Sequence, residues 1–280
     1  MAGEYHGRAA CAAIGGEMAT DDAVLISEPT PGVRLLTLNR PQVRNAMTGE
    51  MTAAWGTAIE EVAADRDTRV AVVTGAGSSF CSGADLSWLD QAAGHDVTTD
   101  RLRDRMLPFY RTWLRPRSLP FPVIAAINGP VVGAAVCLAL SCDLRYAGPG
   151  AMFSTPFIYL GTHAGMGATW LLQEAIGVSR AREMLYTGRE VFSEEALEWG
   201  LIGGVADDVL AHSLKIAEQI AGAAPIATRL TKAGLEQAAH GLEASLQWEA
   251  LAQPVTMTTA DLHEGIEARR HRRSPNFRGL

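Results

Sequence analysis

Cysteines are few in this sequence, and long apolar segments are absent. The four cysteines, Cys11, Cys81, Cys137 and Cys142, include no C-x-x-C pair, so they predict neither a metal site nor a disulfide framework. Cysteines without a pairing pattern are typical of a reducing compartment, and we therefore expect a cytoplasmic protein. No apolar segment approaches the roughly 20 residues that a transmembrane helix needs, so we expect no membrane contact.

Basic residues are not in excess either. The 280 residues include 24 lysines and arginines against 31 aspartates and glutamates, which gives a net charge of −7. A net negative charge leaves the repulsion of phosphates uncompensated, so we expect no nucleic-acid partner. The motifs G-x-x-x-x-G-K-[ST], H-E-x-x-H and G-x-S-x-G are missing, which excludes the common phosphate-transfer, zinc-protease and serine-hydrolase sites.

Up to about residue 165 the chain alternates apolar strands with amphipathic helices. Apolar, β-branched runs predict strands at 33–38, 70–74, 123–127 and 143–147. Apolar residues at helical spacing predict helices at about 48–64 and 100–114. Strands that alternate with helices favour an α/β fold with crossover connections.

After about residue 165 the pattern becomes mostly helical. Start and stop signals predict helices at 165–176, 193–200, 208–221, 226–239, 242–252 and 257–270. Gly177 is expected to end the first of these helices, and Ser193 to cap the second. Long amphipathic helices after a sheet often cover a subunit interface, so we expect a homo-oligomer. Residues 1–20 lack a sustained apolar segment and predict a loose tail rather than a signal peptide.

Two stretches of small residues each follow a predicted strand. They are residues 80–86 (FCSGADL) and 128–135 (NGPVVGAA). Small side chains leave backbone N–H groups uncovered, so a polarised carbonyl oxygen can approach them closely. Two such donors that converge on one oxygen form an oxyanion hole, which stabilises an enolate or a tetrahedral intermediate. The pattern therefore indicates chemistry on a carbonyl group.

Several motifs occur in a fixed order along the chain. They are LTLNRP at 36–41 with RNA at 44–46, TGAG at 74–77 with FCSGADL at 80–86, AAING at 125–129 with CDL at 142–144, and NFRG at 276–279. In combination they resemble the enoyl-CoA hydratase/isomerase family, also called the crotonase family, from about residue 22 to the C-terminus. The resemblance implies a core of repeated ββα units in a spiral at 21–205 and a helical trimerisation region at 206–280.

The same resemblance implies binding of an acyl-CoA substrate, with coenzyme A as part of the substrate and no other cofactor. The oxyanion-hole amides would belong to Ala84 and Ala134, and the coenzyme A contacts would lie near Arg44 and Ala46. Arg272 matches a position where a cation meets the nucleotide phosphate. Without the resemblance, the basic run at 269–273 is also explained as a solvated helix end. Its cations would then interact favourably with the negative end of the helix dipole.

Two positions depart from the family pattern. Hydratases of the family carry two glutamates that hold and deprotonate the attacking water, and these positions align with Cys137 and Phe157. A thiol titrates near ~8.5 and a phenyl ring does not titrate, so we count both residues as part of the substrate-binding wall. Loss of general acid–base help costs about 10²–10⁴ in rate. Cys137 could be a thiolate near a helix start or, the preferred interpretation, a buried core residue.

His163 is the first candidate for the missing proton-transfer group. It lies in the loop at 161–165, and imidazole titrates near neutral pH, although an exposed or structural loop histidine is the preferred interpretation. Two functions stay open. One is an enzyme, a homotrimer or hexamer, that hydrates or isomerises enoyl-CoA. The other is a catalytically silent acyl-CoA binding or sensing protein, which Phe157 favours because an apolar wall suits an acyl chain.

Overall fold

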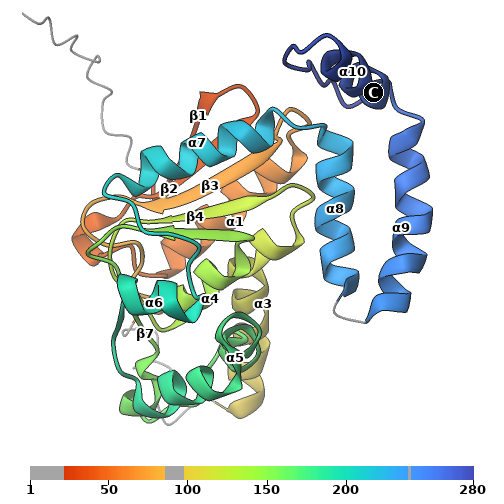
Figure 1. The fold of residues 1–280 in the computed structure, drawn as a ribbon. Helices are drawn as coiled ribbons and strands as arrows, with labels where there is room; N and C mark the ends of the chain where they lie inside the picture. Colours follow the sequence, from red (N-terminus) through yellow and green to blue (C-terminus); the bar gives the residue numbers. More distant parts are fainter. Residues whose placement is uncertain (1–21, 86–97, 239–240) are drawn as a thin grey trace, which may run out of the picture.

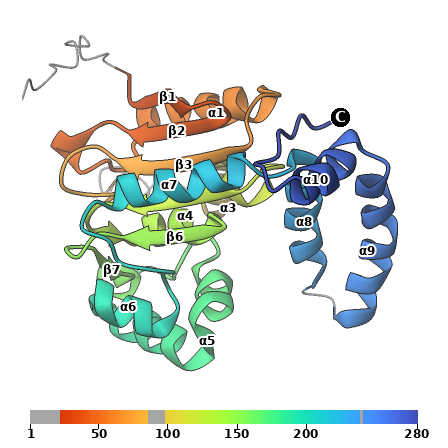
Figure 2. The same cartoon turned by 45° about the horizontal axis from the view of Figure 1, so that its top comes forward.

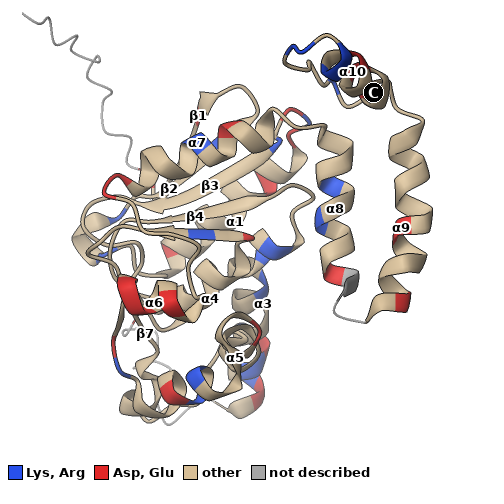
Figure 3. Cartoon of the chain, viewed as in Figure 1, with Lys and Arg blue, Asp and Glu red and all other residues tan. Residues whose placement is uncertain are grey.

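The computed structural model describes residues 22–85, 98–238 and 241–280 (Figure 1). The predicted N-terminal tail at 1–20 and Leu86, the last residue of the FCSGADL motif, lie outside these residues. No helix in the described part of the chain is both long enough and apolar enough to cross a membrane. Charged residues lie mainly on the helices and the connecting loops, and the sheet is largely uncharged (Figure 3).

A five-stranded sheet forms the centre of the molecule, with the order β1-β2-β3-β4-β6. Its strands are β1 (Val24–Thr30), β2 (Val33–Leu38), β3 (Val70–Gly75), β4 (Val123–Ile127) and β6 (Leu144–Ala147). The four predicted strands, β2, β3, β4 and β6, are confirmed, and they pair with one another in parallel. β1 is an addition, an antiparallel edge strand whose partly exposed, polar sequence does not stand out as a buried run.

A second, smaller sheet consists of three short strands. It contains β5 (Val131–Val132), β7 (Met152–Ser154) and β8 (Val191–Phe192). Two single bridges, Met47 with Ala84 and Cys81 with Val131, add further short pairings. A long strand of the large sheet, a short strand or single bridge, and a helix thus follow one another repeatedly along the chain. The helices are α1 (Gly49–Ala64), α3 (Thr99–Trp113), α4 (Ala134–Ser141) and α5 (Ala168–Thr187). This is the repeated ββα arrangement that the resemblance implies.

The two faces of the large sheet pack against different helices because successive strand residues point to opposite sides. Ala71 and Val73 contact the main core with α1, where Trp55 stacks on Trp113 at a ring distance of 5.3 Å. Val70 and Val72 face α7 (Val209–Ala221), which crosses the other side of the sheet (Figure 2). The core therefore holds the ends of β2, β3 and β4 in a fixed arrangement.

Gly177 ends a helical segment, as predicted. With a φ of +76° and a ψ of 164° it separates two helical segments that together form α5, and the second of these, which was not predicted, continues to Thr187. The start of α6 (Ser193–Trp199) differs from the prediction. The residue that caps it is Phe192, while the Ser193 hydroxyl donates to the carbonyl of Pro149, so a tertiary contact outweighs the local capping signal.

The last three helices stand beside the sheet rather than on it (Figures 1 and 2). They are α8 (Pro225–Ala238), α9 (Leu242–Met257) and α10 (Ala260–Arg270); α9 thus runs past its predicted end at residue 252. The buried ammonium of Lys232 on α8 connects them to the core, donating to Asp143 and to the carbonyls of Pro116 and Phe121. No residue of α9 is buried, and its exposed side chains include Leu242, Leu246 and Leu251.

Candidate functional site

A cavity of about 540 Å³ opens beside the loops that follow β2 and β3. Its walls also include one face of α3, the start of α4, and the segment from the short helix η3 (Pro156–Leu160) to Met166. The volume is within the usual range of small-molecule sites, about 300–1,000 Å³. The lining is largely apolar, with Met106, Phe109, Phe157, Leu160 and Met166 among its side chains.

Ala84 and Ala134, the predicted oxyanion-hole residues, both line this cavity. Their loops touch at Gly83. A β-carbon on Gly83 would lie 2.3 Å from the carbonyl oxygen of Val132 and 3.4 Å from the nitrogen of Ala134. Only glycine fits this contact, and its φ of +88° also disfavours any other residue.

The amides of Ala84 and Ala134 have no hydrogen-bond acceptor among the residues that the structure describes. Ala134 is the first residue of α4, where an N–H group has no acceptor within the helix. Neither amide donates a backbone hydrogen bond to any residue in the described part of the chain. The positive end of the α4 dipole adds to the attraction for negative charge at this point. Two residues that line one cavity thus have backbone N–H groups with no acceptor among the described residues.

Asn45 holds the surrounding loops together, and sequence analysis did not single out this residue. Its side chain is completely buried. Nδ2 donates to three carbonyl groups of the turn at 76–80, at 2.9 to 3.3 Å, and Oδ1 accepts from the backbone of Arg40 at 2.8 Å. Its φ of +55° lies in the left-handed region that asparagine tolerates. Asn45 is the middle residue of the Arg-Asn-Ala motif at 44–46, which was therefore a signal in the sequence. The resemblance connected this motif only with coenzyme A.

The backbone next to Asn45 runs alongside the small-residue loop. Ser82 N–H donates to the carbonyl of Arg44 at 3.0 Å, and Met47 N–H donates to the carbonyl of Gly83 at 2.8 Å. These bonds place Arg44 and Ala46 in the wall of the cavity. The Arg44 side chain is exposed at the rim.

Cys137 lies behind the wall and does not line the cavity. Its side chain is fully buried, and Sγ is 3.7 Å from the carbonyl oxygen of Gly165. Burial raises the pKa of Cys137 to about 12, because a thiolate would be poorly solvated there. The residue is therefore a neutral thiol near pH 7, and the start of α4 does not make it a base.

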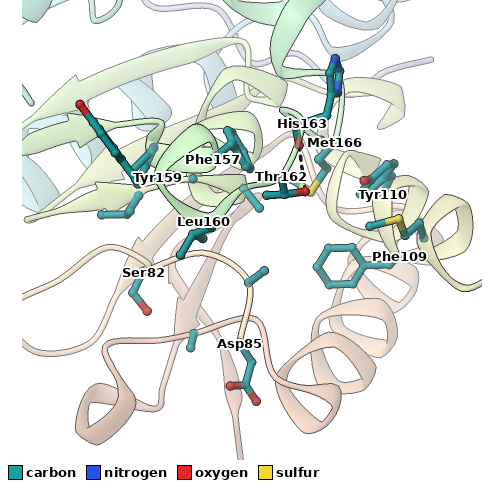
Figure 4. A pocket seen from close by; sticks show the side chains of 18 of the residues that line it. Ser82, Asp85, Phe109, Tyr110, Phe157, Tyr159, Leu160, Thr162, His163 and Met166 are labelled. Atoms are coloured by element: carbon teal, nitrogen blue, oxygen red, sulfur yellow. Dashed lines mark hydrogen bonds between the residues drawn. The ribbon is translucent and has the colours of Figure 1, made fainter. Parts of the chain in front are cut away.

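Phe157 lies in the wall, and its ring packs over the start of α4. A β-carbon on Gly133 would lie 3.9 Å from this ring. Figure 4 shows Phe157 and Phe109 on different sides of the same cavity. The position at which the resemblance leads one to expect a glutamate is thus occupied by an apolar ring in the cavity wall.

The polar side chains at the cavity come from Ser82, Asp85, Tyr110, Tyr159, Thr162 and His163. His163 is exposed, and Figure 4 shows its imidazole turned away from the cavity. Among the described residues that line the cavity, Asp85 is the one with a carboxylate, and it too points away (Figure 4). No group of three or more His, Cys, Asp or Glu side chains in the described ranges could hold a metal ion.

Arg272, the predicted phosphate contact, does not line this cavity. It follows the end of α10 and is exposed, with a φ of +51°. Both views of the fold show α10 far from β7 and α5 (Figures 1 and 2).

Comparison with known proteins gives consistent matches. The family model described as "Enoyl-CoA hydratase/isomerase" matches residues 28–279. A Mycobacterium tuberculosis (strain ATCC 25618 / H37Rv) protein named "Probable enoyl-CoA hydratase EchA14" is 41% identical over 236 residues, which are 84% of this chain and 90% of that protein.

Two further matches come from other bacteria. The 2,3-dehydroadipyl-CoA hydratase of Escherichia coli (strain K12) is 35% identical, over 88% of this chain and 95% of its own length. A crystal structure of an enoyl-CoA hydratase from Bacillus anthracis superposes with a TM-score of 0.86 and 33% identity. That match covers 92% of this chain and 100% of the other.

Proposed function

Because the chain belongs to the enoyl-CoA hydratase/isomerase family, we propose that it acts on enoyl-CoA thioesters and either hydrates them or moves their double bond. The observation that carries this proposal is the pair of amides of Ala84 and Ala134. They line one cavity at the contact between two loops and have no acceptor within the described residues. A thioester oxygen between them would accept both hydrogen bonds, and these would strengthen as the oxygen becomes an enolate oxygen. One such donor is worth about 10²–10³ in kcat.

The rest of the cavity suits the two ends of such a substrate. The side chains of Phe109, Phe157 and Met166 offer an apolar surface to an acyl chain. The Arg44 guanidinium at the rim suits the phosphates of coenzyme A, since arginine binds phosphate oxygens in a fork geometry. We propose no cofactor besides the coenzyme A of the substrate.

A homotrimer, or a hexamer of two trimers, would complete this arrangement. The exposed apolar side chains of α9 are a surface that a second copy could cover. The same assembly could bring Arg272 of a neighbouring copy to the nucleotide phosphate. The cytoplasm stays the predicted location, on the cysteine pattern alone.

His163 stays the sequence-based candidate for the group that moves the proton. To act there, its imidazole must adopt a different rotamer, because the ring is turned away from the cavity (Figure 4). Replacement of His163 by alanine tests this role directly.

A second function has its own support. Cys137 is a buried thiol and Phe157 is apolar, so neither position supplies the carboxylate that activates water in hydratases of the family. A protein that holds an acyl-CoA without transforming it would retain the two amides and the apolar wall. This is the acyl-CoA binding or sensing function.

Crotonyl-CoA and longer enoyl-CoAs distinguish the two functions. We expect the absorbance of the conjugated thioester to fall when substrate meets the purified protein, and calorimetry to report saturable binding of a saturated acyl-CoA. Binding with a constant absorbance at high protein concentration would support the silent binding protein instead. Absence of both binding and turnover would contradict both functions.

A further inference from the structure

Tyr110 lines the cavity and carries a hydroxyl group that the proposed function does not use. It lies on α3 and is half-buried, next to Phe109, whose ring it meets edge-on at 6.1 Å. Figure 4 shows Tyr110 beside Met166 on one side of the cavity. A β-carbon on Gly165 would lie only 2.6 Å from its hydroxyl oxygen. The phenol therefore occupies the space that any side chain at position 165 would take.

This hydroxyl lies beside the position of a missing glutamate. The carbonyl oxygen of Gly165 is 3.7 Å from the Cys137 thiol, and Cys137 is close enough to affect the ionisation of Tyr110. Cys137 follows Ala134 by three residues, so it is less than one helical turn, roughly 4.5 Å along the axis, from the oxyanion-hole amide. The phenol thus reaches the wall from α3 at the place where the family pattern has a carboxylate on α4.

The phenol is protonated under ordinary conditions. Burial raises the pKa of Tyr110 above its usual value near ~10, and a hydrogen bond with the Met166 backbone opposes this shift only in part. Serine and threonine hydroxyls are weaker acids, and the Tyr159 side chain is 74% exposed. Among the hydroxyl groups of the cavity, Tyr110 is therefore the half-buried phenol, which can both give a proton and hold the resulting charge.

We propose that Tyr110 is a catalytic residue that protonates the α-carbon of the thioester enolate. This role rests on the proposed enoyl-CoA activity. As a water oxygen bonds to the β-carbon, the double-bond electrons move toward the thioester oxygen held by Ala84 and Ala134. The enolate then takes the phenolic proton at its α-carbon, and the added water returns one of its protons to the phenolate. One group gives and regains a single proton, and no oxidant or reductant is needed.

This order of steps favours hydration over movement of the double bond. Hydration needs a proton donor when the enolate forms, which a neutral phenol supplies. Double-bond movement begins instead with removal of a C–H proton by a base, and a phenol of raised pKa is rarely ionised at neutral pH. The inference therefore narrows the proposed reaction to addition of water.

Tyr110→Phe removes only the hydroxyl and is the decisive variant. We expect kcat for crotonyl-CoA to fall by about 10²–10⁴-fold, with little change in the Kd of a saturated acyl-CoA and in the far-UV circular dichroism. Deuterium from D₂O should enter the α-carbon of the product in wild-type protein and at a correspondingly lower rate in the variant. Gly165→Ala, which displaces the phenol without removing it, should lower kcat as well.

Tyr159→Phe is the matched control, and we expect it to retain kcat. His163→Ala is the competing test, because it removes the other candidate for the proton-transfer group. An active wild type with an equally active Tyr110→Phe variant overturns the role of Tyr110 but leaves the proposed function intact. If His163→Ala is the inactive variant, the proton belongs to His163. A wild type that binds acyl-CoA without turnover contradicts the enzymatic proposal itself, and the role of Tyr110 with it.

Discussion

The two sides of the cavity are built in different ways. On the side of the proposed oxyanion hole, two loops of small residues line the cavity, and the buried side chain of Asn45 and the close contact at Gly83 hold their positions. On the other side, side chains face the cavity, and the η3 segment that carries Phe157 exposes Ile158, Tyr159 and Leu160. A backbone site tolerates many side chains around it, while a side-chain wall changes chemistry with each substitution. The binding of a thioester oxygen can therefore persist while the acid–base groups change.

The largest effect should come from removing one donor on the oxyanion side. Ala134→Pro deletes an N–H group at the first position of α4, where proline is well tolerated because that N–H lacks a helical partner. We expect kcat to fall by about 10²–10³-fold, the usual effect of one oxyanion-hole donor. Steady-state kinetics with crotonyl-CoA measures it.

Ala134→Gly is the control, because it shortens the side chain but keeps the amide. It should retain most of the activity, and circular dichroism should be native for both variants. Equal losses in the two variants would show that the side chain, rather than the N–H group, matters at this position.

The next effect concerns the stability of the oxyanion side. Asn45→Ala leaves several buried carbonyl groups without a donor, and an unsatisfied buried group costs about 1–3 kcal/mol. We expect the free energy of unfolding to fall by at least this amount in urea titrations. Asn39→Ala, which removes one exposed hydrogen bond, should have a much smaller effect; similar losses would mean that Asn45 does not hold the loops.

On the side-chain wall, substitution should change binding more than folding. Phe157→Ala removes apolar surface from the cavity, and we expect octanoyl-CoA to bind about 10-fold more weakly, because small apolar changes in a pocket cost about 1–3 kcal/mol. Calorimetry measures this change. Tyr159→Ala, at an exposed rim position, should leave the Kd almost unchanged. A larger effect at Tyr159 would locate the acyl chain outside the cavity.

The smallest effect concerns the C-terminal segment, which lies far from either wall. Hydrogen bonds from Arg273 and from the Asn276 amide lower the pKa of Glu264 to about 2. Since the folded pKa lies below the unfolded value near ~4.3, the stabilisation is complete above that value. It is lost as the pH falls toward about 2.

Hydrogen exchange of the Asn276 amide should therefore accelerate, relative to a reference peptide, as the pH falls from 5 toward 2. In Glu264→Gln this extra acceleration should be absent, while Glu243→Gln, on α9, should match the wild type. An identical pH profile in all three proteins would show that the pair does not hold the segment.

Sequence pattern predicted much of the fold. The runs at β2 and β4 were predicted to the residue. β4 is fully buried and continuously apolar, and β2 alternates buried apolar residues with partly buried ones, so both patterns are typical of strands. Local signals also located the start of α1 at Thr48 and of α7 at Asp208, whose side chains cap their helices. The sequence pattern did not predict β1, the second helical segment of α5 after Gly177 or the full length of α9. These segments are partly exposed, so their apolar periodicity is weaker.

By itself, the sequence determined the family, the ββα core and the two small-residue loops, because these depend on residue identity and order. Only the tertiary structure decided which groups face the cavity. It shows the amides of Ala84 and Ala134 without an acceptor in the described part of the chain, the Cys137 thiol behind the wall, the His163 ring turned outward and the Tyr110 hydroxyl against Gly165. The direction of an N–H group or a side chain depends on how distant segments pack, and that information is not local in the chain.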